Sequence, residues 1–298
     1  MNVLTHTKEG KSRGYIESGK LKELWVHTGT NCNLSCSFCL EGSYPGNHRL
    51  SEPCLEELKP FFEEAIELGV EKFSFTGGEP FMNKDFINIL SYAVKLKPCM
   101  VLTNATKPLE HYLEDIYKIE KVKENLSFRV SIDHYTEEVH DRERGKGSYS
   151  RSLKNMKQLQ DNGIHVSLAR QSEKGEDFES VDSQYKSMLK DYAINESMHI
   201  VAFPDFSPPE TVVDVPEITE NCMTQYHTQE TRSQFMCHFS RMLVKKNEAI
   251  DVYACTLVDD DESYSVKGSL KASLEKRVLM RHHRCFACFS GGASCSEI

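Results

Sequence analysis

Strand-like and helix-like segments alternate along the first two-thirds of the chain, and this alternation constrains the fold more than any other feature. The segments of strand length are residues 23–28, 71–76, 99–104, 126–133, 164–170 and 198–203. The segments between them carry apolar residues at helical spacing and are residues 51–69, 83–97, 108–120, 148–163 and 180–193. Such alternation is typical of βαβ units in a parallel sheet. Six strands are fewer than the eight of a closed barrel, so an open or partial barrel and a doubly wound sheet both fit.

The first helical segment shows how its boundaries are expected to form. Ser51 is the expected N-cap of the helix over residues 51–69, and Gly69 is expected to end it. Cys54 within this helix and Cys99 at the start of a strand are expected to be buried free thiols, since cysteine often serves as a small core residue.

The chain changes character near residue 206. Prolines at positions 204, 208, 209 and 216 interrupt the alternation, and six of the 11 cysteines lie beyond this point. We therefore expect an N-terminal extension (1–22), an α/β core domain (23–205) and a small cysteine-rich C-terminal domain (206–298). Residues 241–246 and 249–255, separated by Asn247 and Glu248, predict a β-hairpin in this last domain.

Charge and hydropathy exclude several classes of protein. The formal net charge is -9, which argues against a nucleic-acid partner because such proteins need a basic surface. The N-terminus lacks the apolar core of a signal peptide, and no window approaches about 18 continuous apolar residues, so no membrane association is expected. The expected location is the cytoplasm, where cysteines that cluster are better explained by metal ligation than by disulfides.

Three cysteines follow the first strand at the spacing C-x3-C-x2-C: Cys32, Cys36 and Cys39. A structural zinc site needs four protein ligands. An iron–sulfur cube held by three thiolates leaves one iron open to a small molecule. The loop also lies where the active sites of β/α barrels are found, at the carboxyl end of a strand. A chance spacing or a zinc site is the alternative interpretation of the three cysteines alone.

A second motif, TGGEP at residues 76–80, follows the second strand, and its two glycines allow the backbone to approach a ligand closely. In this order the two motifs resemble those of the radical S-adenosylmethionine (SAM) superfamily, whose last cysteine follows an aromatic residue, here Phe38. The resemblance covers about 180 residues and implies a partial (β/α)6 barrel, a [4Fe–4S] cluster and SAM. It also implies an external one-electron donor such as flavodoxin or ferredoxin. In this superfamily the cluster reduces SAM to a 5′-deoxyadenosyl radical, which removes a hydrogen atom from the substrate.

The resemblance further implies a set of SAM contacts at the ends of the strands. The set comprises Phe38, Thr76, Gly77, Gly78, Glu79, Pro80, Asn104, Ser131, Asp133, Arg144 and Arg170. Arg144 is the first candidate for the methionyl carboxylate, because a planar guanidinium suits a carboxylate, and Arg170 is the second. Ala105 departs from the pattern, since many members have glycine there.

Each of these residues also has a plainer interpretation. Phe38 would be core packing, GGEP a simple turn, and Ser131 and Asp133 caps at the end of a strand. Arg144 would then be one half of a surface salt bridge.

A second set of cysteines lies in the C-terminal region. Cys237 and Cys255 flank the expected hairpin, which brings its ends together, and Cys285 and Cys288 form a C-x2-C pair. Four thiolates complete an iron–sulfur cluster or a structural zinc site. The region resembles the twitch form of the SPASM domain, which carries an auxiliary iron–sulfur cluster and a helical segment like residues 266–278. Ile250 replaces the usual glycine. Cys295 would replace one of these four ligands, bind another cluster or be a free thiol, and the same alternatives apply to Cys222.

These features lead to three functional hypotheses. The first is a radical SAM enzyme of oxidoreductase type, which oxidises a small molecule with an auxiliary cluster as electron acceptor. The second is modification of a peptide or protein. Peptide-modifying members of this superfamily often carry a fused leader-binding domain, for which the 31 residues before Cys32 are too few, and a separate leader-binding partner is the open alternative. The third is a non-catalytic iron–sulfur or zinc sensor, which would need neither the GGEP motif nor the Ser-Ile-Asp segment at residues 131–133.

Overall fold

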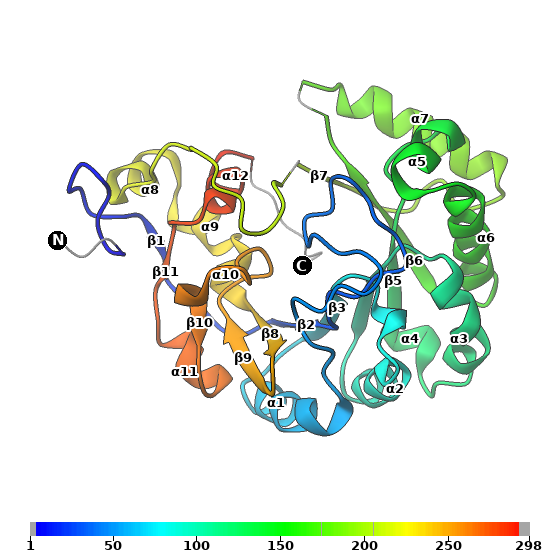
Figure 1. Cartoon of the computed structure of the whole chain (residues 1–298), viewed down its shortest axis with the longest axis horizontal. Coiled ribbons are helices and arrows are strands. Elements are labelled where there is room, and N and C mark those ends of the chain that lie inside the picture. The colour runs from blue at the N-terminus through cyan, green and yellow to red at the C-terminus, as the bar shows by residue number, and fades with distance from the viewer. Residues whose placement is uncertain (1–3, 174, 205, 292–298) are drawn as a thin grey trace.

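A computed structural model describes residues 4–173, 175–204 and 206–291 of the chain (Figure 1). Its centre is a nine-stranded sheet in the order β10-β9-β8-β2-β3-β4-β5-β6-β7. The strands of this sheet are β2 (Glu23–His27), β3 (Lys72–Thr76), β4 (Cys99–Thr103), β5 (Leu126–Ser131), β6 (His165–Gln171), β7 (Ile200–Phe203), β8 (Ser240–Lys246), β9 (Ala249–Tyr253) and β10 (Ser265–Val266). A separate two-stranded sheet pairs β1 (Tyr15–Ile16) with β11 (Val278–Leu279).

The strands β2 to β7 are parallel and lie in sequence order. Because each new strand joins the same edge, the chain winds in one direction, as in a barrel. A doubly wound sheet would instead reverse its strand order at a switch point. Strands β7 and β10 form the two edges and do not pair, so the barrel stays open. The expected α/β fold, a partial (β/α)6 barrel, is therefore confirmed, and the doubly wound alternative is wrong.

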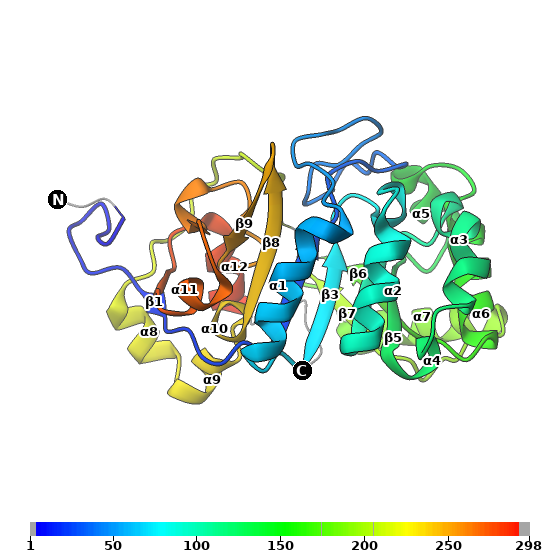
Figure 2. The same ribbon diagram turned by 90° about the horizontal axis from the view of Figure 1, so that it is seen from below.

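Helices join the parallel strands and cover the outside of the sheet. Those of the barrel are α1 (Leu55–Glu67), η1 (Pro80–Met82), α2 (Phe86–Leu96), α3 (Lys107–Tyr117), α4 (Val122–Asn125), α5 (Glu137–Arg144), α6 (Ser148–Asp161) and α7 (Phe178–Asp191). Figure 2 shows α1, α2 and α3 in a row along one face. The buried rings of Phe62 on α1 and Phe73 on β3 lie 4.8 Å apart and belong to the main hydrophobic core.

The first helix begins later than its sequence predicts. Its N-cap is Cys54, whose backbone N–H donates to the Glu57 carboxylate over 2.8 Å. The prediction of Ser51 as N-cap is wrong, because Pro53 falls between Ser51 and the helix and disfavours helical geometry in the residue before it. The predicted end is confirmed: Gly69 follows the last turn with φ +84°, a conformation that glycine adopts without strain.

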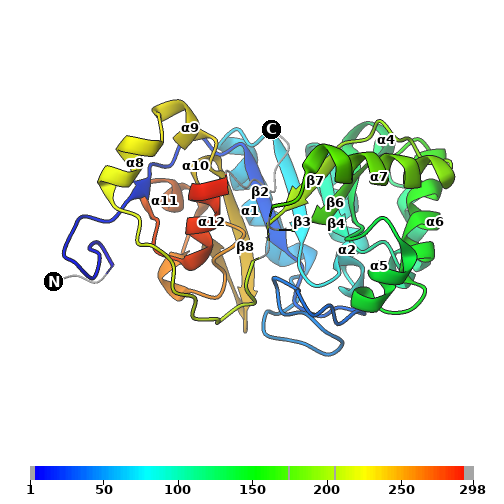
Figure 3. The ribbon, with the colours of Figure 1, turned by 90° about the horizontal axis from the view of Figure 1, so that it is seen from above.

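The C-terminal region continues the sheet of the barrel. Strand β8 pairs in parallel with β2, and β9 returns antiparallel to β8 through a turn at Asn247, so the predicted hairpin is confirmed. The remaining helices are α8 (Glu220–Tyr226), α9 (Gln229–Ser233), α10 (Met236–Phe239), η2 (Glu262–Tyr264), α11 (Leu270–Leu274) and α12 (His283–Gly291). Figure 3 shows α8 to α12 gathered on one side of β8. Of these helices, α11 contacts α1 of the barrel. The helical segment expected over residues 266–278 is limited to α11.

Among the described residues, no helix has the length and apolar character needed to cross a bilayer.

Candidate functional site

The carboxyl ends of the parallel strands surround a cavity of about 200 Å³. The expected site residues that line it are Cys32, Cys36, Phe38, Cys39, Thr76, Gly77, Gly78, Asn104, Ser131, Asp133, Arg144 and Arg170. Glu79 and Pro80 lie below its surface, with 1% exposure for Glu79. The structure thus brings together residues from five strand ends that are up to 138 positions apart in the sequence, from Cys32 to Arg170.

The three thiols of the first loop are chemically suited to bind a metal cluster. Burial and the nearby Glu79 raise the pKa of Cys32 to about 12, and burial also raises the pKa of Cys36. A cationic cluster core would replace the proton of each thiol, because metal binding requires the thiolate. Backbone N–H groups point at two of the sulfurs: Leu34 donates to Cys32 Sγ and Ser43 to Cys39 Sγ, each over 3.4 Å. The donor set therefore fits a three-thiolate iron–sulfur cluster.

The glycines of the TGGEP motif pack against the backbone that leads into the cysteine loop. A Cβ atom on Gly78 would lie 2.4 Å from the Asn31 carbonyl oxygen, and one on Gly77 would lie 2.6 Å from that of Gly29. Gly77 also has φ +144°, which disfavours any other residue. These contacts explain both glycines by chain packing, in addition to the close ligand approach expected from the sequence.

Glu79 connects two of the motifs. Its carboxylate accepts hydrogen bonds from Thr103 Oγ1 over 2.8 Å and from the Asn104 backbone N–H over 2.9 Å. The Asn104 side chain then donates to Cys32 Sγ over 3.8 Å. Ala105, which replaces the family glycine, keeps the left-handed conformation with φ +51°. The altered residue therefore preserves the backbone turn that follows β4.

Arg144 lies within the cavity wall beside the cysteine loop. Its Nε donates to Asp133, and its guanidinium lies 5.7 Å from the centre of the Phe38 ring. Despite burial, the charge of Asp133 raises the pKa of Arg144. These three residues lie in separate segments of the sequence, but the structure joins them into one group next to Cys39.

Arg170, the second expected partner for a carboxylate ligand, is already paired within the protein. Its guanidinium forms ion pairs with Glu176 over 2.6 Å and Asp182 over 3.1 Å. Its side chain is 1% exposed. Between the two arginines, the geometry favours Arg144 as the residue that faces a ligand.

A buried chain of charges lies beneath the cysteine loop and was not predicted from the sequence. His27 Nε2 lies 3.0 Å from Glu41, Glu41 lies 3.3 Å from Arg49, and Arg49 lies 2.6 Å from Asp259. Burial opposes ionisation of Glu41, but His27 and Arg49 hold the pKa of this carboxyl below its usual value. No local pattern reveals this chain, because Asp259 is 210 residues from Arg49.

A second, smaller cavity of about 30 Å³ lies in the C-terminal region. Cys237, Cys255, Cys285 and Cys288 all line it, and Leu257 borders both this cavity and the first one. Burial raises the pKa of Cys285 to about 11 and also raises the pKa values of Cys237 and Cys255. Four thiols that face one cavity fit a sulfur-ligated metal group.

Among the described residues, the remaining cysteines, Cys54, Cys99 and Cys222, line neither cavity. Cys222 lies on α8, where its Sγ is 3.1 Å from Thr219 Oγ1, and it does not line the second cavity. Cys295 falls outside the described residues. Within the described part of the chain, no three cysteine, histidine or carboxylate side chains meet closely enough to hold a single metal ion.

The barrel and its cysteine loop also match known proteins. Residues 26–170 match the model of the Radical SAM superfamily. This segment is a radical SAM domain. The matched segment begins within β2 and ends within β6, so it includes the three cysteines, the TGGEP motif and Arg144.

The curated relatives are similar to this chain over only part of their own length. The subtilosin biosynthesis protein AlbA of Bacillus subtilis is 35% identical over 140 residues, which cover 46% of this chain and 30% of AlbA. A GTP 3′,8-cyclase of Pectobacterium atrosepticum is 36% identical over 73 residues, 23% of this chain and 21% of the cyclase. The matched part of the chain thus spans less than a third of these curated relatives.

A solved structure supports the fold over a longer stretch. The crystal structure of Streptococcus suis SuiB bound to its precursor peptide SuiA superposes with a TM-score of 0.62 at 14% identity. The superposition covers 86% of this chain and 65% of SuiB. It extends beyond the barrel, although identity this low establishes the fold alone.

Proposed function

We propose that this protein cleaves SAM reductively and oxidises its substrate with the help of a second iron–sulfur centre. The observation that carries the proposal is the pair of neighbouring cavities, one lined by three cysteines and the other by four. Leu257 borders both cavities, so a substrate near the first would lie close to the second. A centre with four thiolates has no open ligand position, which suits electron transfer better than substrate binding.

When bound, the three-cysteine cluster and SAM supply a radical that removes a hydrogen atom from the substrate. Cys32, Cys36 and Cys39 would hold this cluster, and Asn104 would support it through its contact with Cys32 Sγ. Arg144 and Asp133 form the polar side of the cavity and would orient SAM. Phe203, Phe206 and Leu257 form an apolar side that would exclude water from a radical.

The substrate class is a peptide or a small molecule. AlbA takes part in the biosynthesis of the bacteriocin subtilosin, and SuiB was crystallised with a precursor peptide. These relatives favour a peptide side chain as the group that is oxidised. Oxidation of a free small molecule, the first hypothesis from the sequence, becomes the second candidate, since electron transfer to a closed second centre suits either class of substrate.

Anaerobic reconstitution with iron and sulfide tests the proposal. With SAM and dithionite, the wild-type protein should release 5′-deoxyadenosine. Two [4Fe–4S] clusters would give about eight irons per chain, and the triple variant Cys32→Ala, Cys36→Ala, Cys39→Ala would keep about four. A triple variant without iron would disprove the second centre. A protein that binds iron but yields no 5′-deoxyadenosine would be a sensor and not an enzyme.

A matched control separates ligand loss from general damage. Cys54 caps α1 and lines neither cavity, so Cys54→Ser should keep the full iron content. Zinc analysis of the triple variant in parallel identifies the metal, because four cysteines also suit a structural zinc site.

A further inference from the structure

Two buried guanidinium groups lie beside the four-cysteine cavity. Arg241 belongs to β8, and Arg284 lies in the first turn of α12, directly before Cys285. Each residue is 1% exposed. In the described part of the chain, both groups donate only to carbonyl and hydroxyl oxygens and to no carboxylate. Among the described side chains, these two buried positive charges thus have no carboxylate as a direct partner.

Arg241 is fixed next to the first of the four cysteines. Its Nη1 donates to the Cys237 carbonyl oxygen over 2.9 Å, and its Nε donates to Ser273 Oγ over 3.1 Å. Because the contacted carbonyl belongs to Cys237 itself, the guanidinium cannot move away without disturbing this cysteine.

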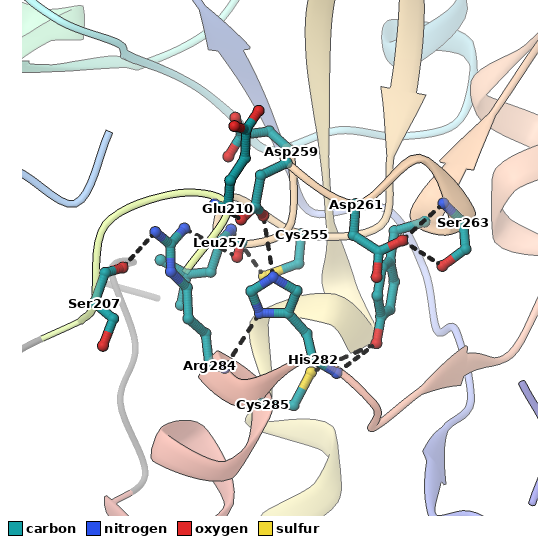
Figure 4. A network of polar contacts seen from close by, with 12 residues as sticks. Ser207, Glu210, Cys255, Leu257, Asp259, Asp261, Ser263, His282, Arg284 and Cys285 are labelled. Atoms are coloured by element: carbon teal, nitrogen blue, oxygen red, sulfur yellow. Dashed lines mark hydrogen bonds and ion pairs between the residues drawn. The ribbon is translucent and has the colours of Figure 1, made fainter. Parts of the chain in front are cut away.

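The Arg284 guanidinium points toward Ser207 and Leu257 (Figure 4), and its hydrogen bonds reach both cysteine loops. Its Nη2 donates to the Leu40 carbonyl oxygen over 2.8 Å and to that of Ser207 over 2.7 Å, while Nη1 donates to Leu257 over 3.3 Å. Leu40 follows Cys39 in the first loop, and Leu257 lies two residues after Cys255 in the second. The positive charge therefore lies against both loops.

The carboxylates in the neighbourhood of Arg284 are already engaged. Glu41 is held by His27 and Arg49. Asp260 lies 3.0 Å from His282 Nε2 and also accepts a hydrogen bond from the Glu210 backbone N–H over 2.8 Å. Neither carboxylate comes within hydrogen-bonding distance of Arg284, so neither neutralises it directly.

A buried charge without a counter-charge is costly, and here the four cysteines are the groups that can offset it. The negative charge of four thiolates exceeds the positive charge of an iron–sulfur core, so the loaded centre is an anion. We propose that Arg241 and Arg284 are the counter-charges of the second centre and make its reduction potential more positive. Reduction adds one further negative charge, which a fixed guanidinium in a low-dielectric site favours. The inference rests on the proposed second cluster.

The consequence is a centre that accepts an electron more readily. In the proposed reaction the substrate radical would give one electron to this centre and a proton to solvent, and its carbon would become oxidised. A more positive potential favours that direction. The two arginines would set the driving force without touching the substrate.

A redox titration of the second centre alone tests this. The triple variant Cys32→Ala, Cys36→Ala, Cys39→Ala supplies the background, and dithionite titration is followed by electron paramagnetic resonance. Arg241→Gln and Arg284→Gln should each lower the equilibrium constant for reduction of the second centre at least tenfold. For a one-electron couple this is a shift of the reduction potential by about 59 mV to more negative values. Arg241→Lys and Arg284→Lys keep the charge and should shift the potential much less. Arg151→Gln removes a half-exposed charge from α6 and should cause no shift.

The outcomes separate this inference from the proposed function. A background variant without iron would mean that the second centre does not exist. An iron-loaded background whose potential is the same in both glutamine variants would overturn the counter-charge role. Loss of iron in the lysine and glutamine variants alike would also overturn it, because packing and not charge would then explain both arginines. Arg241→Gln provides an independent result if Arg284→Gln does not fold.

Discussion

The carboxylate of Glu79 accepts a hydrogen bond from the backbone N–H of Asn104 over 2.9 Å and thereby ties the loop after β3 to the loop after β4. The second loop in turn contacts the sulfur of Cys32. A residue buried beneath the cavity thus holds together the motifs that line it. Burial raises the pKa of Glu79 to about 7, although the hydrogen bonds from Asn104 and Thr103 act to lower it.

The pKa of Glu79 predicts a pH dependence of stability. The folded protein binds the proton more tightly than the unfolded chain, so the free energy of unfolding should fall as pH rises from about 4.5 to about 7. Glu79→Gln does not titrate and should gain up to about 3 kcal/mol relative to wild type over this window. Urea unfolding at pH 5 and pH 8 measures the difference, and parallel pH profiles would contradict it.

His140 predicts a pH dependence of the opposite sign. Burial and the nearby Arg144 lower its pKa to about 4, and neither ring nitrogen has a hydrogen-bond partner among the described residues. The unfolded chain binds this proton more tightly, so stability should fall as pH drops from about 6.5 to about 4, by up to about 3 kcal/mol. His140→Phe should weaken this acid sensitivity in acid titrations followed by circular dichroism. An unchanged acid midpoint would show that His140 does not contribute.

Gly78→Ala should disrupt the first cysteine loop. The added Cβ would lie 2.4 Å from the Asn31 carbonyl oxygen, directly before Cys32, so the backbone must shift. We expect a loss of about 1–3 kcal/mol in unfolding free energy and reduced iron content at the first site. Gly46→Ala is the control, because no atom lies within 4 Å of the new Cβ. With φ +81° it should cost about 1 kcal/mol and keep the iron. Equal iron loss in both variants would contradict the packing argument.

Arg144→Lys should weaken SAM binding to the reconstituted protein by about tenfold, or about 1.4 kcal/mol. Lysine keeps the charge but lacks the planar group that pairs with Asp133 and lies against Phe38. Isothermal titration calorimetry measures the dissociation constant. Arg170→Lys is the comparison: Arg170 is occupied by Glu176 and Asp182, so we expect a smaller effect on SAM affinity. A larger effect at Arg170 would reverse the assignment.

The order of the motifs was predictable because each one is local. Strand periodicity places a strand end before Cys32, before Gly77 and before Asn104, and parallel strands gather their carboxyl ends at one edge of the sheet. The predicted hairpin rests on two short alternating runs around Asn247. The sequence could not decide between a doubly wound sheet and a partial barrel, since both use the same βα units.

The cysteines and their spacing were determined by the sequence alone, as was their division into a set of three after the first strand and a larger set in the C-terminal region. The tertiary structure decided what surrounds them. The contact of Arg284 with Leu40 spans 244 positions, and that of Arg49 with Asp259 spans 210. Hydrophobic periodicity reports how one segment folds, whereas a buried charge is positioned by the crossing of distant loops. For this reason the sequence indicates the chemistry of the two sites, and the fold alone reveals the charges placed against them.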